Sequence, residues 1–383
     1  MSVFRKYLIL TPYFPTENNH VGSYIYDQAK AVEKLSKFDV EVIKLVGPFS
    51  KEEDYFLDGL KVHIFKVIDI PFFILPGFFN TLNSNRICSF ISERFLSIDL
   101  AIVHAHVCYP SVFLANALSS RYDIKTIIQH HGIDALQLLN GRFPIITKIQ
   151  NSILRRVFIK QLNNIDLNVS VSKLVEKKLH SYEEYSPISE YVLYNGVDKE
   201  KFYPFKEKPS ETYSIGCVAN FWPIKDHINL IKAVESIIAD GVEDISLRLI
   251  GKGETLEKCV NYVMKNNLGR YVSFEKERAH TKLNQFYNEL NLLVLPSYYE
   301  ALGCVLLEAW ATNTPVISID NQGFSEILPE NELENLLASK QDSQSLKEKI
   351  MGEYEKKRVL AFDERYYIKN TISEFLKQPI FNL

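Results

Sequence analysis

Cysteine is scarce in this sequence, with five residues in 383 and no C-x-x-C pair. An odd, scattered set of cysteines predicts neither a disulfide framework nor a zinc site, and it is typical of a reducing compartment. Long apolar runs are also missing, because no segment reaches 18 apolar residues and the N-terminal MSVFRKYLILTPYFP is too short for a signal peptide or a membrane span. We therefore expect a cytoplasmic protein whose membrane contact, if any, is peripheral, at the inner face of the cytoplasmic membrane.

An excess of charge of one sign is lacking as well. The formal net charge of -3 gives no global field that would attract nucleic acid, so we expect no nucleic-acid partner. There is no D-x-D pair to support a metal-bound diphosphate, and we expect neither a metal nor another cofactor. What is present is an ordinary globular balance of 46% hydrophobic and 24% charged residues, and a chain of this length favours two domains.

Strand-like and helix-like segments alternate along the chain, and the alternation runs twice. The first half predicts strands at 6–11, 40–46, 100–106 and 125–132, with helices at 24–37 and 111–122. The second half predicts strands at 213–220, 246–253, 271–276, 290–297 and 314–320, with helices at 226–240, 255–267 and 302–312. This pattern is typical of α/β domains with parallel sheets, and YNGVDKEKFYPFKEKPSET (194–212), rich in Gly, Pro and charge, predicts a linker between two Rossmann-like, doubly wound domains.

Two carboxylates flank the predicted helix start in PSYYEALGCVLLEAWATNTPVISID (296–320). Open α/β sheets bind ligands beyond the carboxyl ends of their strands, and Glu300 lies in such a loop while Glu308 lies one helical turn into the next helix. Unpaired N–H groups at the helix start suit an anion; they belong to Gly303, Cys304 and Val305. Acids on both sides of an anion site suit a nucleotide sugar, which has hydroxyls at both ends and phosphates between them. Taken singly, each acid is also explained as an ordinary loop or helix-surface residue.

Several further segments occur in a recognisable order: YFPTENNHVGSYIYDQAKAVEKL, VHAH, HHGID, VSVSKLVEKKL, YNGVDKEKFYP, IGCVANFWPIKDHINLIKA, LRLIGKGE and NQGFSEIL. Together with the two glutamates seven residues apart around the helix start, they resemble the retaining glycosyltransferases of family four, which have the GT-B fold. The resemblance covers nearly the whole chain. It implies two Rossmann-like domains facing across a cleft, the first at 1–205 and the second at 206–361, with the tail at 362–383 crossing back onto the first domain.

The resemblance implies a donor site mainly on the second domain. Glu308 would bind the ribose, Glu300 would hold the donor sugar near its transferring carbon, and the amides that follow Gly303 would take the diphosphate. Lys225 resembles the lysine that pairs with the diphosphate as a point charge. The family usually has an arginine five residues before this lysine, whereas this chain has Asn220, an amide donor without charge.

Three residues of the first half complete the predicted site. Gly22 resembles the glycine whose loop approaches the phosphates, although an ordinary helix-entry glycine is the alternative. His131 resembles the motif histidine beside the reacting sugar, with His130 as the alternative one residue away. His106, in VHAH, is predicted to bind substrate, and packing at the strand end is an equal alternative.

The resemblance implies a hexosyltransferase that works with retention and without a protein nucleophile. The leaving phosphate would take the acceptor's proton, while the protein supplies position and charge. The donor would be a UDP- or GDP-sugar and the acceptor a saccharide or a polyprenyl-diphosphate-linked sugar, in surface polysaccharide or glycoconjugate biosynthesis. A basic amphipathic segment at 143–164 indicates either a membrane surface or a helix packed on the core. A nucleotide-sugar epimerase or hydrolase of the same fold and a catalytically silent scaffold are the alternative functions.

Overall fold

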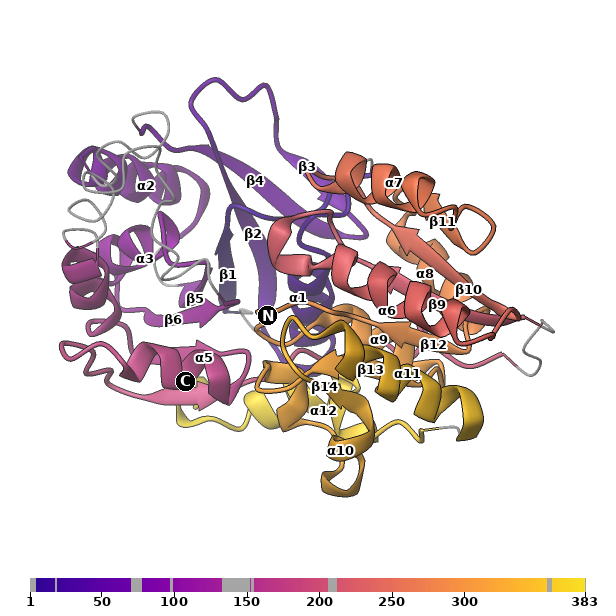
Figure 1. Cartoon of the computed structure of the whole chain (residues 1–383). Helices are drawn as coiled ribbons and strands as arrows, with labels where there is room; N and C mark the ends of the chain where they lie inside the picture. Colours follow the sequence, from indigo (N-terminus) through magenta and orange to yellow (C-terminus); the bar gives the residue numbers. More distant parts are fainter. Residues whose placement is uncertain are drawn as a thin grey trace. The chain divides into compact units, whose positions relative to one another are not determined.

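The computed structural model describes residues 5–17, 19–69, 78–96, 99–132, 152, 155–205, 212–356 and 360–382. The chain divides into two compact units (Figure 1). Unit 1 comprises Met1–Tyr194 and Lys369–Leu383, and unit 2 comprises Asn195–Ile368. Each unit contains a sheet with helices packed against it, and each is described by itself below.

The sheet of unit 1 has eight strands in the order β3-β4-β2-β1-β5-β6-β7-β8. All neighbouring pairs are parallel except β3–β4, which is antiparallel. The strands are β1 (Lys6–Thr11), β2 (Asp39–Val46), β3 (Tyr55–Leu57), β4 (Leu60–Lys66), β5 (Leu100–His106), β6 (Lys125–His130), β7 (Leu167–Ser170) and β8 (Glu190–Val192). The central strands are buried on both faces, and this explains why their sequences are nearly continuous apolar runs.

The helices of unit 1 pack on this sheet because each has an apolar stripe. Figure 1 shows α2 and α3 side by side, and their apolar residues join those of β1, β5 and β6 in one core. The described helices are α1 (Ser23–Leu35), α2 (Asn80–Arg94), α3 (Ser111–Ser119), α5 (Lys173–His180) and α12 (Ile368–Phe375), followed by the 3₁₀ turn η8 (Pro379–Phe381). None of the described helices of either unit is long and apolar enough to cross a membrane.

The sheet of unit 2 has six strands, all parallel, in the order β11-β10-β9-β12-β13-β14. Its strands are β9 (Tyr213–Val218), β10 (Ile245–Ile250), β11 (Val272–Glu275), β12 (Leu292–Val294), β13 (Val316–Ile319) and β14 (Leu337–Ala338). Its helices are α6 (His227–Ala239), α7 (Leu256–Lys265), α8 (His280–Asn288), α9 (Cys304–Ala311), α10 (Leu333–Leu336) and α11 (Ser343–Lys356). Its 3₁₀ turns are η4 (Pro223–Lys225), η5 (Gly323–Glu326), η6 (Glu330–Glu332) and η7 (Glu364–Tyr366). The prediction of two α/β, doubly wound parallel sheets is therefore confirmed.

The segments at the borders of the units have clear packing partners. Residues 195–205, which the sequence analysis placed in the first domain, pack in unit 2, where the Tyr203 N–H donates to Asn284 Oδ1 (3.0 Å) and the Phe205 N–H donates to Asn288 Oδ1 (2.6 Å). Residues 369–383 belong to unit 1, in which the Phe375 ring lies 6.0 Å from the ring of His104.

The described part of the basic amphipathic segment is helical at 155–162. Its apolar side chains, Phe158, Ile159 and Leu162, are buried in the core of unit 1, whereas Arg156 and Lys160 are exposed. The helix thus packs on the core and presents a basic face to solvent. Residues 143–151, 153 and 154 of this segment lie outside the described residues.

Candidate functional site

The strand order of unit 2 has its switch point between β9 and β12. Chain connections run outward in opposite directions from these two central neighbours, so their following loops diverge at the carboxyl ends of the strands, where open α/β sheets bind ligands. The loop after β9 carries Asn220 and Lys225, and the loop after β12 carries Glu300 and Gly303. The residues predicted for the donor thus converge on the switch point of this sheet.

Lys225 and Glu300 form an ion pair across these two loops. Their Nζ and Oε2 atoms lie 2.5 Å apart, and the two side chains are 21% and 17% exposed. The main chain ties the same loops together, because the Tyr298 N–H donates to the carbonyl of Ile224 (3.0 Å). The lysine charge is therefore compensated by a carboxylate that the sequence analysis assigned to the sugar end of the donor.

Glu300 is held by residues on both sides. Its N–H donates to Gln322 Oε1 (2.7 Å), and its carbonyl accepts from the Gly323 N–H (3.1 Å). Gly303 has φ +82°, and a Cβ there would lie 3.2 Å from Glu300 Cγ. A glycine at this position therefore leaves room for the glutamate and permits the left-handed turn that starts α9. The sequence analysis did not predict that Gln322 supports Glu300.

The N-terminus of α9 adds a partial positive charge to the same loop. The helix begins at Cys304, and the Leu306 N–H donates to the Gly303 carbonyl at 2.9 Å. Cys304 Sγ accepts a hydrogen bond from Asn195 Nδ2 (3.2 Å), so the thiol is engaged within unit 2, and Val305 follows it in the first turn. The axial dipole of this turn favours an anion at its start.

Glu308 is buried on α9, with 8% of its surface exposed. Its Oε2 accepts a hydrogen bond from the Tyr287 hydroxyl (2.7 Å), and its Oε1 lies 3.0 Å from His280 Nε2. Burial, and then the charge of Glu308, raises the pKa of Tyr287 well above its ordinary value, so this hydroxyl stays protonated and donates. Sequence reasoning missed both residues, which lie seven positions apart on α8.

The loop after β9, which contains Asn220, is held in place by contacts with the loop after β10. The Phe221 N–H donates to the Lys252 carbonyl (2.8 Å), and the Phe221 ring stacks on His227 with centroids 4.0 Å apart. A Cβ at Gly251 would lie 2.1 Å from the Ala219 carbonyl oxygen, so only glycine permits this contact. The Asn220 side chain is exposed and brings no charge to the loop.

The switch point of unit 1 lies between β1 and β5. Gly22 ends the loop after β1 and precedes α1, with φ +88°. A Cβ at this position would lie 2.5 Å from the Tyr13 carbonyl oxygen, so the fold of this loop itself requires glycine here.

His106, at the end of β5, and His131, directly after β6, are hydrogen-bonded to each other. His106 Nδ1 lies 2.9 Å from His131 Nε2. Burial lowers the pKa of His131 to about 3, with a smaller effect of His130, and burial takes the pKa of His106 well below its ordinary value. His130 is a different case: it lies on the opposite face of β6, with its Nε2 at 3.3 Å from Asn168 Oδ1. His131 is therefore the histidine that shares a face with His106.

Within the described ranges, no group of three His, Cys, Asp or Glu side chains is placed to hold a metal ion.

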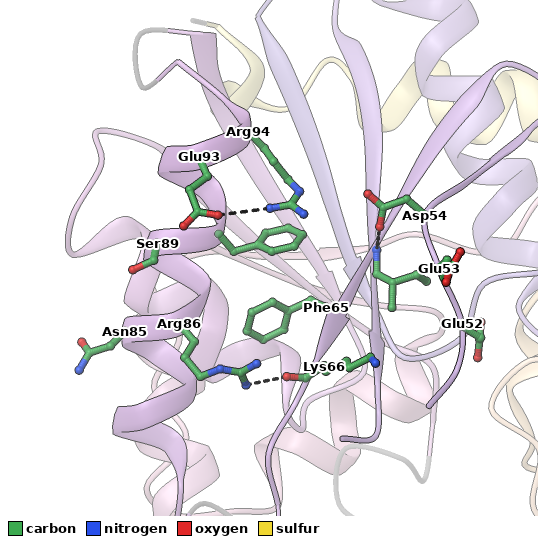
Figure 2. Close-up of a pocket in the computed structure, with 12 residues that line it drawn as sticks. Glu52, Glu53, Asp54, Phe65, Lys66, Asn85, Arg86, Ser89, Glu93 and Arg94 are labelled. Carbon is green, nitrogen blue, oxygen red and sulfur yellow. Dashed lines mark hydrogen bonds and ion pairs between the residues drawn. The ribbon is translucent and has the colours of Figure 1, made fainter. Parts of the chain in front are cut away.

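A groove of about 660 Å³ lies in unit 1 between α2 and the β3–β4 edge of the sheet (Figure 2). Arg94 lies over the Phe90 ring at 3.9 Å, and Arg86 lies over Phe65 at 5.3 Å. The groove contains none of the predicted site residues.

Comparison with protein-family models assigns both units. Residues 21–201 match the model "Glycosyltransferase Family 4", and residues 198–369 match "Glycosyl transferases group 1". The two matches overlap only at residues 198–201 and together include every residue predicted for the site.

Relatives with curated descriptions agree with these models. The chain is 29% identical over 351 residues to "Uncharacterized glycosyltransferase MJ1178" of Methanocaldococcus jannaschii, covering 91% of this chain and 88% of the relative. It is 31% identical over 137 residues to "O-antigen chain mannosyltransferase RfbU" of Salmonella typhimurium, covering 36% and 37% of the two chains.

Solved structures share the fold. Sucrose-phosphate synthase from Thermosynechococcus elongatus has a TM-score of 0.73 at 18% identity, covering 97% of this chain and 94% of that one. Anabaena Alr3699/HepE in complex with UDP and glucose has a TM-score of 0.69 at 17% identity, covering 99% and 100%. The fold of this chain is GT-B.

Proposed function

The chain belongs to the glycosyltransferases of family 4 and group 1, and we propose that it transfers a hexose, with retention, from a UDP- or GDP-sugar to a saccharide or polyprenyl-diphosphate-linked acceptor. The observation that carries the proposal is the Lys225–Glu300 pair at the switch point of unit 2. The bond that breaks in this reaction joins a phosphate to a sugar. The lysine cation suits the phosphate, and the carboxylate beside it suits the hydroxyls of the sugar.

The donor's nucleoside diphosphate is held by the loops after β9 and β12. Lys225 supplies a point charge to the diphosphate, and the start of α9 at Gly303, Cys304 and Val305 supplies main-chain donors and a dipole. Glu308 accepts from the ribose hydroxyls with the lone pairs that Tyr287 and His280 leave open.

The reaction breaks the bond between the anomeric carbon and the phosphate oxygen, and it forms the bond to the acceptor oxygen on the same face of the sugar. The acceptor's proton passes to the leaving phosphate, so no protein base or nucleophile is consumed. Lys225 stabilises the charge that grows on the phosphate, and Glu300 holds the sugar hydroxyls in position. His131 contacts the transferred sugar, and Gly22 lets its loop approach the phosphates.

The comparisons support a glycan product without naming it. One solved neighbour is in complex with UDP and glucose, and one relative is described as an O-antigen chain mannosyltransferase. These descriptions favour UDP- and GDP-hexoses as the first donors to test and surface polysaccharide as the first pathway. The exposed basic residues at 156 and 160 support a peripheral contact with the cytoplasmic membrane.

The test is release of nucleoside diphosphate from a panel of UDP- and GDP-sugars, with and without polyprenyl-diphosphate-linked saccharides. We expect release that requires an acceptor, and a product whose anomeric configuration, read from proton NMR couplings, equals that of the donor. Release without an acceptor would indicate a hydrolase. Binding of nucleotide without turnover on any donor would indicate a silent scaffold.

A further inference from the structure

Both oxygens of the Glu308 carboxylate are held by one face of α8. His280 Nε2 lies 3.0 Å from Oε1, and the Tyr287 hydroxyl donates to Oε2 at 2.7 Å. His280 and Tyr287 are two helical turns apart, so they share a face of the helix. Their positions decide in which direction the remaining lone pairs of the carboxylate point. Tyr287 is fully buried, whereas the side chain of His280 is 17% exposed, so the His280 ring depends on a further neighbour for its orientation.

The Phe202 ring is such a neighbour, and it contacts both groups that hold Glu308. Its centroid lies 5.1 Å from that of the His280 ring, with an angle of 69° between the ring planes, and 5.9 Å from that of the Tyr287 ring, with an angle of 45°. Phe202 is buried, with 2% of its surface exposed. Because pairs of rings have preferred geometries, this contact orients the neighbouring rings more strictly than an aliphatic side chain would.

The main chain next to Phe202 is fixed by two asparagines of the same helix. The Tyr203 N–H donates to Asn284 Oδ1 (3.0 Å), and the Tyr203 carbonyl accepts from Asn288 Nδ2 (3.0 Å). The Phe205 N–H donates to Asn288 Oδ1 (2.6 Å). Both asparagines are buried, and buried amides are destabilising unless they are hydrogen-bonded. The hydrogen bonds of these amides thus hold the chain beside α8, with the Phe202 ring turned inward.

We propose that Phe202 is a positioning residue of the nucleotide site. It orients His280 and Tyr287, and through them it directs the Glu308 carboxylate toward the ribose hydroxyls of the donor; the ribose as the partner of Glu308 rests on the proposed function. Phe202 does not contact the nucleotide itself, because its ring is buried and acts through the two side chains that hold Glu308. The segment at 195–205, which the sequence analysis treated as part of a linker, then takes part in donor binding.

The experiment is isothermal titration calorimetry of the whole protein with two nucleotides, UDP and 2′,3′-dideoxyuridine diphosphate. Phe202→Leu keeps an apolar side chain but removes the ring, and UDP should bind about threefold to tenfold more weakly, the value of one aromatic pair. The dideoxy nucleotide offers no ribose hydroxyl to Glu308, so its affinity should change by less than about twofold. Phe202→Met, which is also apolar and without a ring, should give the same pair of results. Equal losses for the two nucleotides would contradict the proposal.

Tyr213→Leu is the matched control. Tyr213 is also buried in unit 2 and forms a T-shaped pair with Tyr354 at 5.0 Å, but it lies at the amino end of β9, whereas the site lies at the carboxyl ends of the strands. Its replacement should leave the UDP affinity within about twofold of the wild type, and a loss as large as that of Phe202→Leu would mean that any lost ring weakens binding. In a Glu308→Ala background, Phe202→Leu should have no further effect on UDP affinity, and additive losses would refute action through Glu308.

Crystal structures of the wild type and of Phe202→Leu, both without nucleotide, supply a readout that needs no ligand. We expect the His280 ring to turn in the variant, so that its Nε2 leaves hydrogen-bond distance of Glu308 Oε1. A variant in which His280, Tyr287 and Glu308 keep their wild-type positions would overturn the proposal. If the wild type binds neither UDP nor GDP, the proposed function fails, while the two crystal structures still decide whether Phe202 orients the carboxylate, so the two failures are distinguishable.

Discussion

Replacing Glu300 by glutamine tests whether the Lys225–Glu300 ion pair competes with the nucleotide. The two charged atoms lie 2.5 Å apart, and both side chains are about four-fifths buried. A diphosphate must therefore either displace the carboxylate from the lysine or bind beside a like charge. Both cases penalise binding, so Glu300→Gln should bind UDP more tightly than the wild type.

The size of the effect follows from the burial of the pair. Exposed ion pairs contribute about 0.2–1 kcal/mol, and hydrogen bonds to charged groups contribute about 1.5–3 kcal/mol. A partly buried pair lies between these ranges, at about 1–2 kcal/mol, which corresponds to UDP binding tighter by about fivefold to thirtyfold. Turnover should fall at the same time, because the neutral side chain is a weaker acceptor for the sugar hydroxyls.

Isothermal titration calorimetry with UDP measures the first effect. Glu277→Gln is the matched control, because Glu277 pairs with Lys252 (2.7 Å) on the neighbouring loops but both side chains are far more exposed, at 46% and 75%. It should change the affinity by less than about twofold. If Glu300→Gln binds UDP with wild-type or lower affinity, the pair does not oppose the nucleotide and the reasoning is wrong.

Three further predictions concern the supports of the site and the membrane. Tyr287→Phe removes the 2.7 Å hydrogen bond that holds the buried carboxylate of α9, and calorimetry should find UDP binding weaker by about tenfold; an unchanged affinity would mean that the carboxylate is oriented without it. Arg156→Glu combined with Lys160→Glu should abolish salt-sensitive flotation with vesicles containing phosphatidylglycerol, since both side chains are exposed; flotation equal to the wild type would place any membrane contact elsewhere. Gly22→Ala should lower the melting temperature by about 5 °C, because its Cβ would lie 2.5 Å from the Tyr13 carbonyl oxygen; an unaltered melting temperature would show that the loop relaxes freely.

The sheets were predictable because buried parallel strands are continuous apolar runs. The strands at 6–11 and 100–106 were predicted with the bounds that β1 and β5 have. In contrast, α2 was missed, since only Asn83, Ile87, Cys88 and Ile91 of its fifteen residues are buried and its sequence is otherwise polar. Strand β3, three residues long, is too short to give a pattern of alternation.

The site was predictable only in part. Glu300 and Glu308 were predicted from their places after a strand and at a helix start, whereas Lys225 was predicted from the resemblance alone. Their supports, Gln322 and Tyr287, lie 22 and 21 residues away along the chain, and one sequence does not reveal which distant polar residue meets which loop. A partial signal existed on α8, where His280 and Tyr287 are two helical turns apart and therefore share a face.

The loop of Asn220 allows a test of how positive charge is distributed at the diphosphate. Its backbone is set by Gly251 and Gly253, where a Cβ would lie 2.1 Å from the Ala219 carbonyl oxygen and 2.5 Å from that of Phe221. The exposed side chain at position 220 plays no part in these contacts, so Asn220→Arg should change the charge of the loop without changing its course.

With no arginine in this loop, Lys225 should supply most of the charge that faces the leaving diphosphate. Lys225→Ala should therefore cost about 3–4 kcal/mol of transition-state stabilisation, a hundredfold to thousandfold in turnover. In an Asn220→Arg background the same substitution should cost distinctly less, because a second cation is then present; Asn220→Arg alone should be tolerated or mildly activating. Steady-state rates of the four proteins form a double-mutant cycle. If Lys225→Ala keeps more than about a tenth of wild-type turnover, the lysine is not the main anchor of the diphosphate, since a loss below about 1.4 kcal/mol is smaller than removing one preorganised donor usually causes.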